Sequence, residues 1–182
     1  MSKEPKEIYL KDYQKPAFSI KSVNLTFELF EDETIVTNIM NVQKVDENEK
    51  DLMLHAGELE LLEVVLDEKP LDTQSYVVTP ASLKIMNVAS TFTLKIVNKI
   101  YPQKNTELEG LYKSGNIFCT QNEPEGFRRI TPYLDRPDVM SVFTTTVIAD
   151  KEKYPVLLSN GNRVKCYDSL DNRHGVTWYD PH

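Results

Sequence analysis

Apolar and polar residues alternate along much of this chain. Val23, Leu25 and Phe27 fall on one face of an extended segment, and the residues between them are polar. A period of two is what a half-buried β-strand requires. Strand-like segments recur to the end of the sequence, and we predict strands at 23–29, 34–42, 52–54, 59–66, 75–79, 83–86, 92–97, 117–118, 142–148, 163–167 and 175–179. This spacing predicts an antiparallel β-sandwich or a saddle of sheets.

The balance of residue types supports an all-β fold with at most one or two short helices. The sequence has 16 Val, 10 Ile and 14 Thr but only 5 Ala. β-Branched side chains pack well on a pleated surface, whereas Ala is the strongest helix former. One short helix is predicted at 135–140, where Pro137 and the flanking aspartates are typical of a helix start.

Turn residues predict how the strands are connected. Asn160-Gly161 is a strong hairpin signal, so we expect 154–159 to lead into the turn and 163–167 to return from it. Residues 99–116 contain proline and glycine and are predicted to be irregular.

The domain organisation is predicted to be simple. Pro5 and Pro16 block regular structure near the start, so residues 1–16 are expected to form an extended lead-in. Residues 17–182 show no repeat, low-complexity tract or linker, and we predict a single β-rich domain.

Charge excludes some classes of partner. Asp and Glu number 28 against 21 Lys and Arg, which gives a net charge of -7 and argues against nucleic acid or an anionic membrane as a partner. No apolar run approaches the ~20 residues of a membrane helix, and the charged start lacks a secretory signal.

Cys119 and Cys166 form no disulfide framework and are predicted to be small buried residues. We therefore expect a cytoplasmic protein.

The usual catalytic constellations are missing from the sequence. The six glycines are scattered and form no phosphate-binding loop. His55, His174 and His182 have no i, i+4 spacing that would present two imidazoles to zinc, and His55 is predicted to be a surface residue at a strand end. The chain by itself does not have the pattern of a complete catalyst.

One polar loop stands out. Gln121, Glu123 and Glu125 lie between a short predicted strand and Gly126. Loops carry binding residues disproportionately, and a carboxylate here could accept hydrogen bonds from a ligand ammonium group. From composition alone, the simpler interpretation is favoured, in which the two glutamates form a solvated ion-pair network with Arg128, Arg129 or Arg136.

Several motifs carry a resemblance that changes this balance. They include Cys-Thr-Gln-Asn-Glu-Pro-Glu-Gly-Phe-Arg at 119–128 and Tyr-Leu-Asp-Arg-Pro-Asp-Val at 133–139, with supporting runs at 105–115, 154–162 and 178–181. From Tyr13 onward, the sequence resembles the amino-terminal domain of the bacterial aminopeptidase N family. Members of this family are zinc metallo-aminopeptidases of the gluzincin type. The two central motifs are long and unusual, so the resemblance is specific.

The resemblance implies a β-rich saddle that packs against a thermolysin-like catalytic domain. In the family, that domain holds one zinc ion through H-E-x-x-H and carries the G-A-M-E-N motif, and neither motif occurs here. The chain is therefore expected to be the first domain of a larger enzyme, inactive alone and without metal ligands. The resemblance also implies that Glu123 binds the α-amino group of a peptide substrate, that Gln121 lines the pocket for the first side chain, and that Glu125 is structural and pairs with an arginine.

Two alternatives remain open from the sequence. The chain could be a non-catalytic β-sandwich interaction module, or a degenerate family member whose zinc site is lost further along. If a catalytic domain docks on this one, we expect an apolar and partly charged face around Glu123 and residues 99–116.

Overall fold

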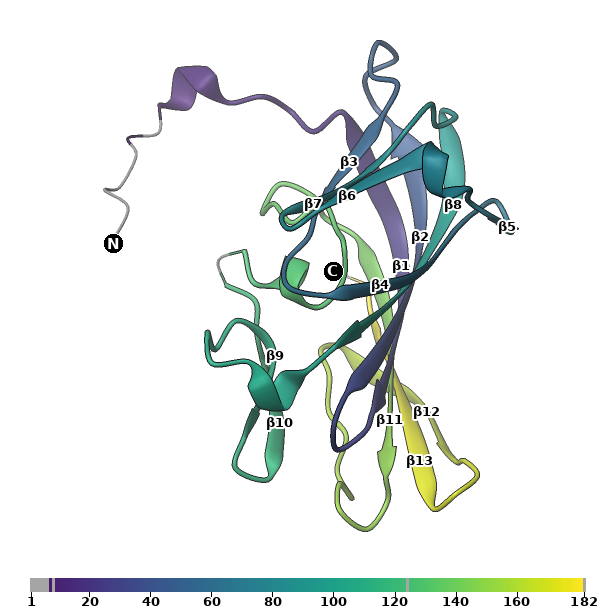
Figure 1. Ribbon diagram of the computed structural model, residues 1–182. Coiled ribbons are helices and arrows are strands. Elements are labelled where there is room, and N and C mark those ends of the chain that lie inside the picture. The colour runs from purple at the N-terminus through teal and green to yellow at the C-terminus, as the bar shows by residue number, and fades with distance from the viewer. Residues whose placement is uncertain (1–6, 8, 124, 182) are drawn as a thin grey trace.

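A large twisted sheet runs through the whole molecule (Figure 1). The computed structural model describes residues 7, 9–123 and 125–181. Eight strands of the described residues form this sheet, in the order β12-β13-β11-β1-β2-β8-β4-β5. Their bounds are β1 (Phe18–Leu29), β2 (Thr34–Lys44), β4 (Glu60–Leu66), β5 (Lys69–Pro70), β8 (Thr91–Ile100), β11 (Val142–Asp150), β12 (Asn162–Asp168) and β13 (Arg173–Asp180). Neighbouring strands are antiparallel except β1 and β11, which pair in parallel.

Two smaller sheets lie on one side of the large sheet (Figure 1). One has the order β3-β7-β6, and the other is the β9-β10 hairpin. Their bounds are β3 (Leu52–His55), β6 (Tyr76–Thr79), β7 (Ser82–Ile85), β9 (Gly110–Ser114) and β10 (Ile117–Gln121). The helical elements of the described residues are short 3-10 turns: η1 (Leu10–Asp12), η2 (Thr73–Ser75), η3 (Pro102–Lys104) and η4 (Phe127–Arg129). The predicted all-β class is confirmed. No helix among the described residues is long and apolar enough to cross a lipid bilayer.

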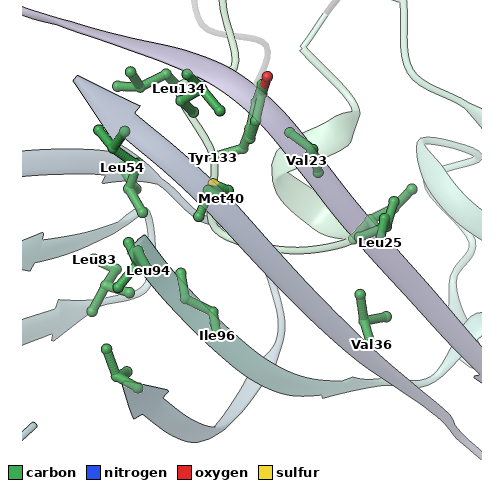
Figure 2. Close-up of a cluster of buried hydrophobic side chains, with 14 of the residues drawn as sticks. Val23, Leu25, Val36, Met40, Leu54, Leu83, Leu94, Ile96, Tyr133 and Leu134 are labelled. Atoms are coloured by element: carbon green, nitrogen blue, oxygen red, sulfur yellow. The ribbon is translucent and has the colours of Figure 1, made fainter. Parts of the chain in front are cut away.

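The hydrophobic core lies between the large sheet and the small three-stranded sheet. Alternate residues of β1, β2 and β8 point into it, as the period of two predicts. Figure 2 shows Met40 and Leu94 of the large sheet beside Leu54 and Leu83 of the small one, with Tyr133 closing one side. The segment after η4 therefore belongs to the core.

The segment before β1 is tied to the rest of the chain. Tyr13 Oη donates to Asp138 Oδ2 at 2.9 Å, and Arg136 Nη2 donates to the carbonyl of Gln14 at 2.8 Å. The expected lead-in therefore contains η1 and has polar contacts at its end, and residues 1–6 and 8 lie outside the described part.

The short helix predicted at 135–140 is wrong. This segment is irregular with one turn, because its polar groups bond elsewhere. The backbone N–H of Asp135 donates to His55 Nδ1 at 3.2 Å, and Arg136 pairs with Asp138 at 2.7 Å. These bonds hold the chain in a form that cannot continue as a helix.

The predicted hairpin at Asn160-Gly161 is also wrong. Residues 155–161 are not in a strand, and β12 pairs with β13 instead. A Cβ added to Gly161 would come within 2.2 Å of the Tyr179 carbonyl oxygen. The glycine therefore permits close approach to β13. Because β12 is at the edge of the sheet, Cys166 is exposed, contrary to prediction. Cys119 lies in β10 of the two-stranded sheet and is only partly buried, which also differs from the prediction.

Candidate functional site

The β9-β10 hairpin ends at the predicted binding loop. Gln121 is the last residue of β10 and pairs with Gly110 of β9. The two strands are joined by Gly115 and Asn116, and Gly115 has a φ of +57°. β9 lies in the segment that we predicted to be irregular. Gly-Asn is a two-residue hairpin signal that could have predicted β9, but it was not used in that prediction.

The predicted binding loop, called the recognition loop below and described at residues 121–123, 125 and 126, folds back on the end of the hairpin. Gln121 Nε2 donates to the Glu123 carbonyl at 3.3 Å, and the Gly126 N–H donates to the Asn122 carbonyl at 3.1 Å. Gly126 is buried, and a Cβ there would come within 2.4 Å of the Gln121 carbonyl oxygen. The loop is therefore compact, and its glycine is required by close packing of backbone against backbone.

The Glu123 side chain is exposed at the tip of this loop. Within the described part of the chain, its carboxylate has no hydrogen-bond or ion-pair partner. Glu125 differs, because it pairs with Arg128 at 3.4 Å, and its predicted pairing with an arginine is confirmed. The solvated network thus includes Glu125 but, within the described residues, not Glu123.

The other two arginines of that network pair elsewhere. Arg129 Nε contacts Glu109 at 3.1 Å, and Arg136 pairs with Asp138. Glu123 is therefore not part of an arginine cluster.

Arg128 joins the end of the recognition loop to the segment that follows it. Its Nε donates to Asp135 Oδ2 at 2.8 Å, and its Nη2 donates to the Asp135 carbonyl at 3.0 Å. The Arg128 backbone N–H also donates to Asp135 Oδ2, at 3.1 Å. The Asp135 side chain is 12% exposed, so this ion pair is largely shielded from solvent. The sequence analysis did not identify Asp135 as the partner of Arg128.

His55 joins the same segment to the small three-stranded sheet. His55 and Tyr133 exchange backbone hydrogen bonds, and His55 Nδ1 accepts from the Asp135 N–H. Burial lowers the pKa of His55, and the positive charge of Arg128 lowers it further. Asp135 and Glu125 oppose this effect. The predicted surface histidine is thus partly buried and has a hydrogen-bonding role.

Two buried asparagines support the segment from the large sheet. Asn98 of β8 and Asn38 of β2 are fully buried. Asn98 Nδ2 donates to the Ile130 carbonyl at 2.8 Å, and Asn38 Nδ2 lies 3.5 Å from Thr131 Oγ1. Both asparagines occupy positions where the strand period calls for an apolar residue, which is a signal present in the sequence.

Aromatic packing fills the space beneath the loop. The Phe127 ring meets the Tyr133 ring edge to face, with 4.9 Å between centroids, and also contacts Phe143. Burial raises the pKa of Tyr133 to about 12, and its hydroxyl is bonded to Ser141 at 2.7 Å. Tyr133 therefore stays neutral and serves the core.

The described residues offer no site for zinc. Among them, no group of three or more His, Cys, Asp or Glu side chains is placed to hold a metal ion. His174, for example, is bonded through Nε2 to the Tyr154 carbonyl at 2.8 Å. The residues present do not fit a zinc centre.

An apolar groove lies next to the β9-β10 hairpin. It has a volume of about 460 Å³ and is lined by β10 and the segment 153–160. Ile117, Val156 and Leu158 on its walls are exposed, as is Leu108 in the segment before β9. Lys113 pairs with Glu31 beside it. An apolar and partly charged surface is therefore present at the hairpin, where it includes Leu111 and Asn116 of the segment 99–116, but Glu123 is not among its lining residues.

Comparison with known proteins identifies the family. The Peptidase M1 N-terminal domain family matches residues 13–182. The chain is 45% identical to aminopeptidase N of Escherichia coli over 181 residues, and 39% identical to aminopeptidase N of Haemophilus influenzae over 174 residues. These alignments cover 100% and 95% of this chain but 21% and 20% of the two relatives. The chain belongs to the Peptidase M1 N-terminal domain family.

Solved structures agree with this assignment. Aminopeptidase A of Legionella pneumophila, in complex with aspartic acid, matches with a TM-score of 0.89 and 31% identity over 94% of this chain and 20% of that one. An M1 zinc metallopeptidase of Deinococcus radiodurans matches with a TM-score of 0.76 over 91% of this chain and 39% of that one, and at 13% identity it supports the fold alone. The chain spans about a fifth of the length of the curated relatives that it matches.

Proposed function

We propose that this chain is the substrate-recognising domain of a zinc aminopeptidase that removes single residues from peptide amino termini. Glu123 binds the α-amino group of the peptide, and Gln121 lines the pocket for its first side chain. The observation that carries this proposal is the exposed Glu123 carboxylate, which lacks a partner within the described residues and lies on a compact loop of an M1 amino-terminal domain.

The chemistry of the loop suits an exopeptidase. An enzyme that acts at a free amino terminus needs a fixed negative charge that binds an ammonium group. A hydrogen bond to a charged group contributes about 1.5–3 kcal/mol, and it places the first peptide bond in a defined position. Gln121 Nε2 bonds to the Glu123 carbonyl, which couples the two proposed binding residues. In this proposal, the chain binds the amino terminus of the peptide and thereby orients its first peptide bond.

The remaining parts of the proposal concern the rest of the polypeptide. Since the described residues do not fit a zinc centre, the metal would be held by a catalytic domain outside this chain. The apolar groove beside β10 is where we place that domain, because β10 carries both the groove residue Ile117 and the site residue Gln121. We further propose a cytoplasmic location and a role in peptide catabolism.

A substitution of Glu123 in the intact protein tests the proposal. Glu123→Ala removes the charge, and the binding energy above corresponds to a fall in kcat/KM of about 10- to 100-fold, mainly through a higher KM. Glu107→Ala is the matched control, because Glu107 is another exposed glutamate close to β9 in the sequence. Unchanged kinetics for Glu123→Ala would remove Glu123 from the site.

A further inference from the structure

The recognition loop has an exposed tip and a firmly bonded base. At the tip, residues 121–123 are exposed. At the base, the Arg128 side chain contacts Glu125 on one side and Asp135 on the other, at 3.4 and 2.8 Å. The Arg128 side chain is 23% exposed, and that of Asp135 is 12% exposed.

We propose that Arg128 is a positioning residue for substrate recognition: its guanidinium fixes the recognition loop so that Glu123 is held where a peptide amino group binds. This inference rests on the proposed function of Glu123. Arg128 itself touches no substrate, and it acts through the backbone of the loop.

The geometry requires an arginine. One planar guanidinium donates to the Asp135 carboxylate and to the Asp135 carbonyl, and it forms an ion pair with the Glu125 carboxylate. A planar fork can bond to several oxygens at fixed angles, whereas a lysine ammonium is a single point charge on a flexible stem. Lysine would keep the charge at this position but could not hold both sides of the loop base.

The backbone of Arg128 is fixed independently of its side chain. Its carbonyl accepts from the Gly57 N–H at 2.8 Å, and its N–H donates to Asp135 Oδ2. Two residues later, the Ile130 carbonyl is held by Asn98. The base is therefore anchored to the large sheet through Asn98 and to the segment after β3 through Gly57, and the Arg128 side chain contacts Glu125, two residues from Glu123.

Ordering the loop in advance has a direct effect on affinity. A loop that must become ordered when the ligand binds loses binding free energy to conformational entropy. A displacement of about 1 Å at a binding group can lower the rate by about 100-fold. We therefore expect loss of the Arg128 guanidinium to weaken binding of the substrate's amino group.

The test compares two adjacent arginines in the intact protein. Arg128→Lys should raise KM for peptide substrates by about 10-fold, from partial loss of the binding energy of Glu123, with kcat changed less. Arg129→Lys is the matched control, since Arg129 pairs with Glu109, outside the recognition loop, and should change KM less than twofold. Equal effects in the two variants would overturn the proposal.

A double-mutant cycle separates positioning from general stability. If Arg128 acts through Glu123, Arg128→Lys should add little to the KM of Glu123→Ala, whereas a merely structural effect would multiply with it. Multiplying effects would refute the inference. If Arg128→Lys folds poorly, Asp135→Asn provides a second test, because it weakens the Arg128–Asp135 ion pair and should raise KM in the same way. An unchanged KM for a folded Asp135→Asn would also refute the inference.

The outcome for Glu123 is read separately. If Glu123→Ala alone leaves KM unchanged, the proposed function fails, and this inference fails with it. If Glu123→Ala raises KM but the two arginine variants behave alike, only the positioning role of Arg128 is lost.

Discussion

Gly126→Ala is the substitution whose effect on the recognition loop can be worked out most fully. Gly126 has φ −86° and ψ −22°, a conformation that alanine adopts without strain. The difficulty is space, because the new Cβ would lie 2.4 Å from the Gln121 carbonyl oxygen and 2.9 Å from Asn122 Cα. Both neighbours are backbone atoms, so the chain itself must move.

The size of the movement follows from these distances. Ordinary contact begins at 3.4 Å, so the Gln121 carbonyl must shift by 3.4 less 2.4, about 1 Å. Overpacking of this kind lowers the free energy of unfolding by about 1–3 kcal/mol. A shift of about 1 Å in the binding loop would lower kcat/KM of the intact protein by up to about 100-fold.

Gly115→Ala is the matched control. Gly115 has a φ of +57° and no heavy atom within 4 Å of its added Cβ. Alanine in the left-handed conformation costs about 1–2 kcal/mol, so stability should fall by a similar amount without any shift of Gln121. Urea unfolding measures the stability of both variants, and peptide hydrolysis measures their activity. Equal activity in the two variants would refute the reasoning that connects Gly126 to the site.

Two further predictions concern the groups that hold the segment after the loop. Asn98→Ala should lower the free energy of unfolding by about 1–3 kcal/mol, because the buried Ile130 carbonyl loses its donor; the exposed Asn41→Ala should change it by less than about 0.5 kcal/mol, and equal losses would contradict this account. Burial lowers the pKa of His55 below 6.5, so its neutral form, which accepts from the Asp135 N–H, contributes stability that is complete above pH 6.5 and lost as pH falls below it. His55→Gln should lose stability less steeply between pH 6.5 and 5 in thermal unfolding, and an unchanged pH profile would exclude His55 as the cause.

The local pattern was sufficient to predict the strands of the core. The alternation in 23–29 and 92–97 predicted β1 and β8 correctly, because a half-buried strand requires that period whatever its partner is. The pattern could not specify partners. It predicted that 154–159 would pair with 163–167, but β12 pairs with β13, which lies further along the chain.

In the candidate site, too, local residues were predicted but their distant partners were not. The motif that includes Gln121 and Glu123 was predicted to be a binding loop from its resemblance to a family. The groups that hold the segment after the loop were not, since Asn98 and His55 are distant in sequence from Ile130 and Asp135, to which they bond only in the folded chain. Arg128 was identified in the sequence as a possible partner of glutamate, yet its contact with Asp135 became clear only from the folded chain.

The sequence by itself therefore determined the all-β class and the apolar faces of the strands, because these depend on local periodicity and composition, while the loop around Glu123 was proposed as a site from its resemblance to a family. The tertiary structure decided the strand order, the parallel pairing of β1 with β11 and the bonds that hold the loop. These depend on which distant polar groups become neighbours when the sheets pack together, and a buried donor or acceptor must then find its partner in whatever segment lies against it.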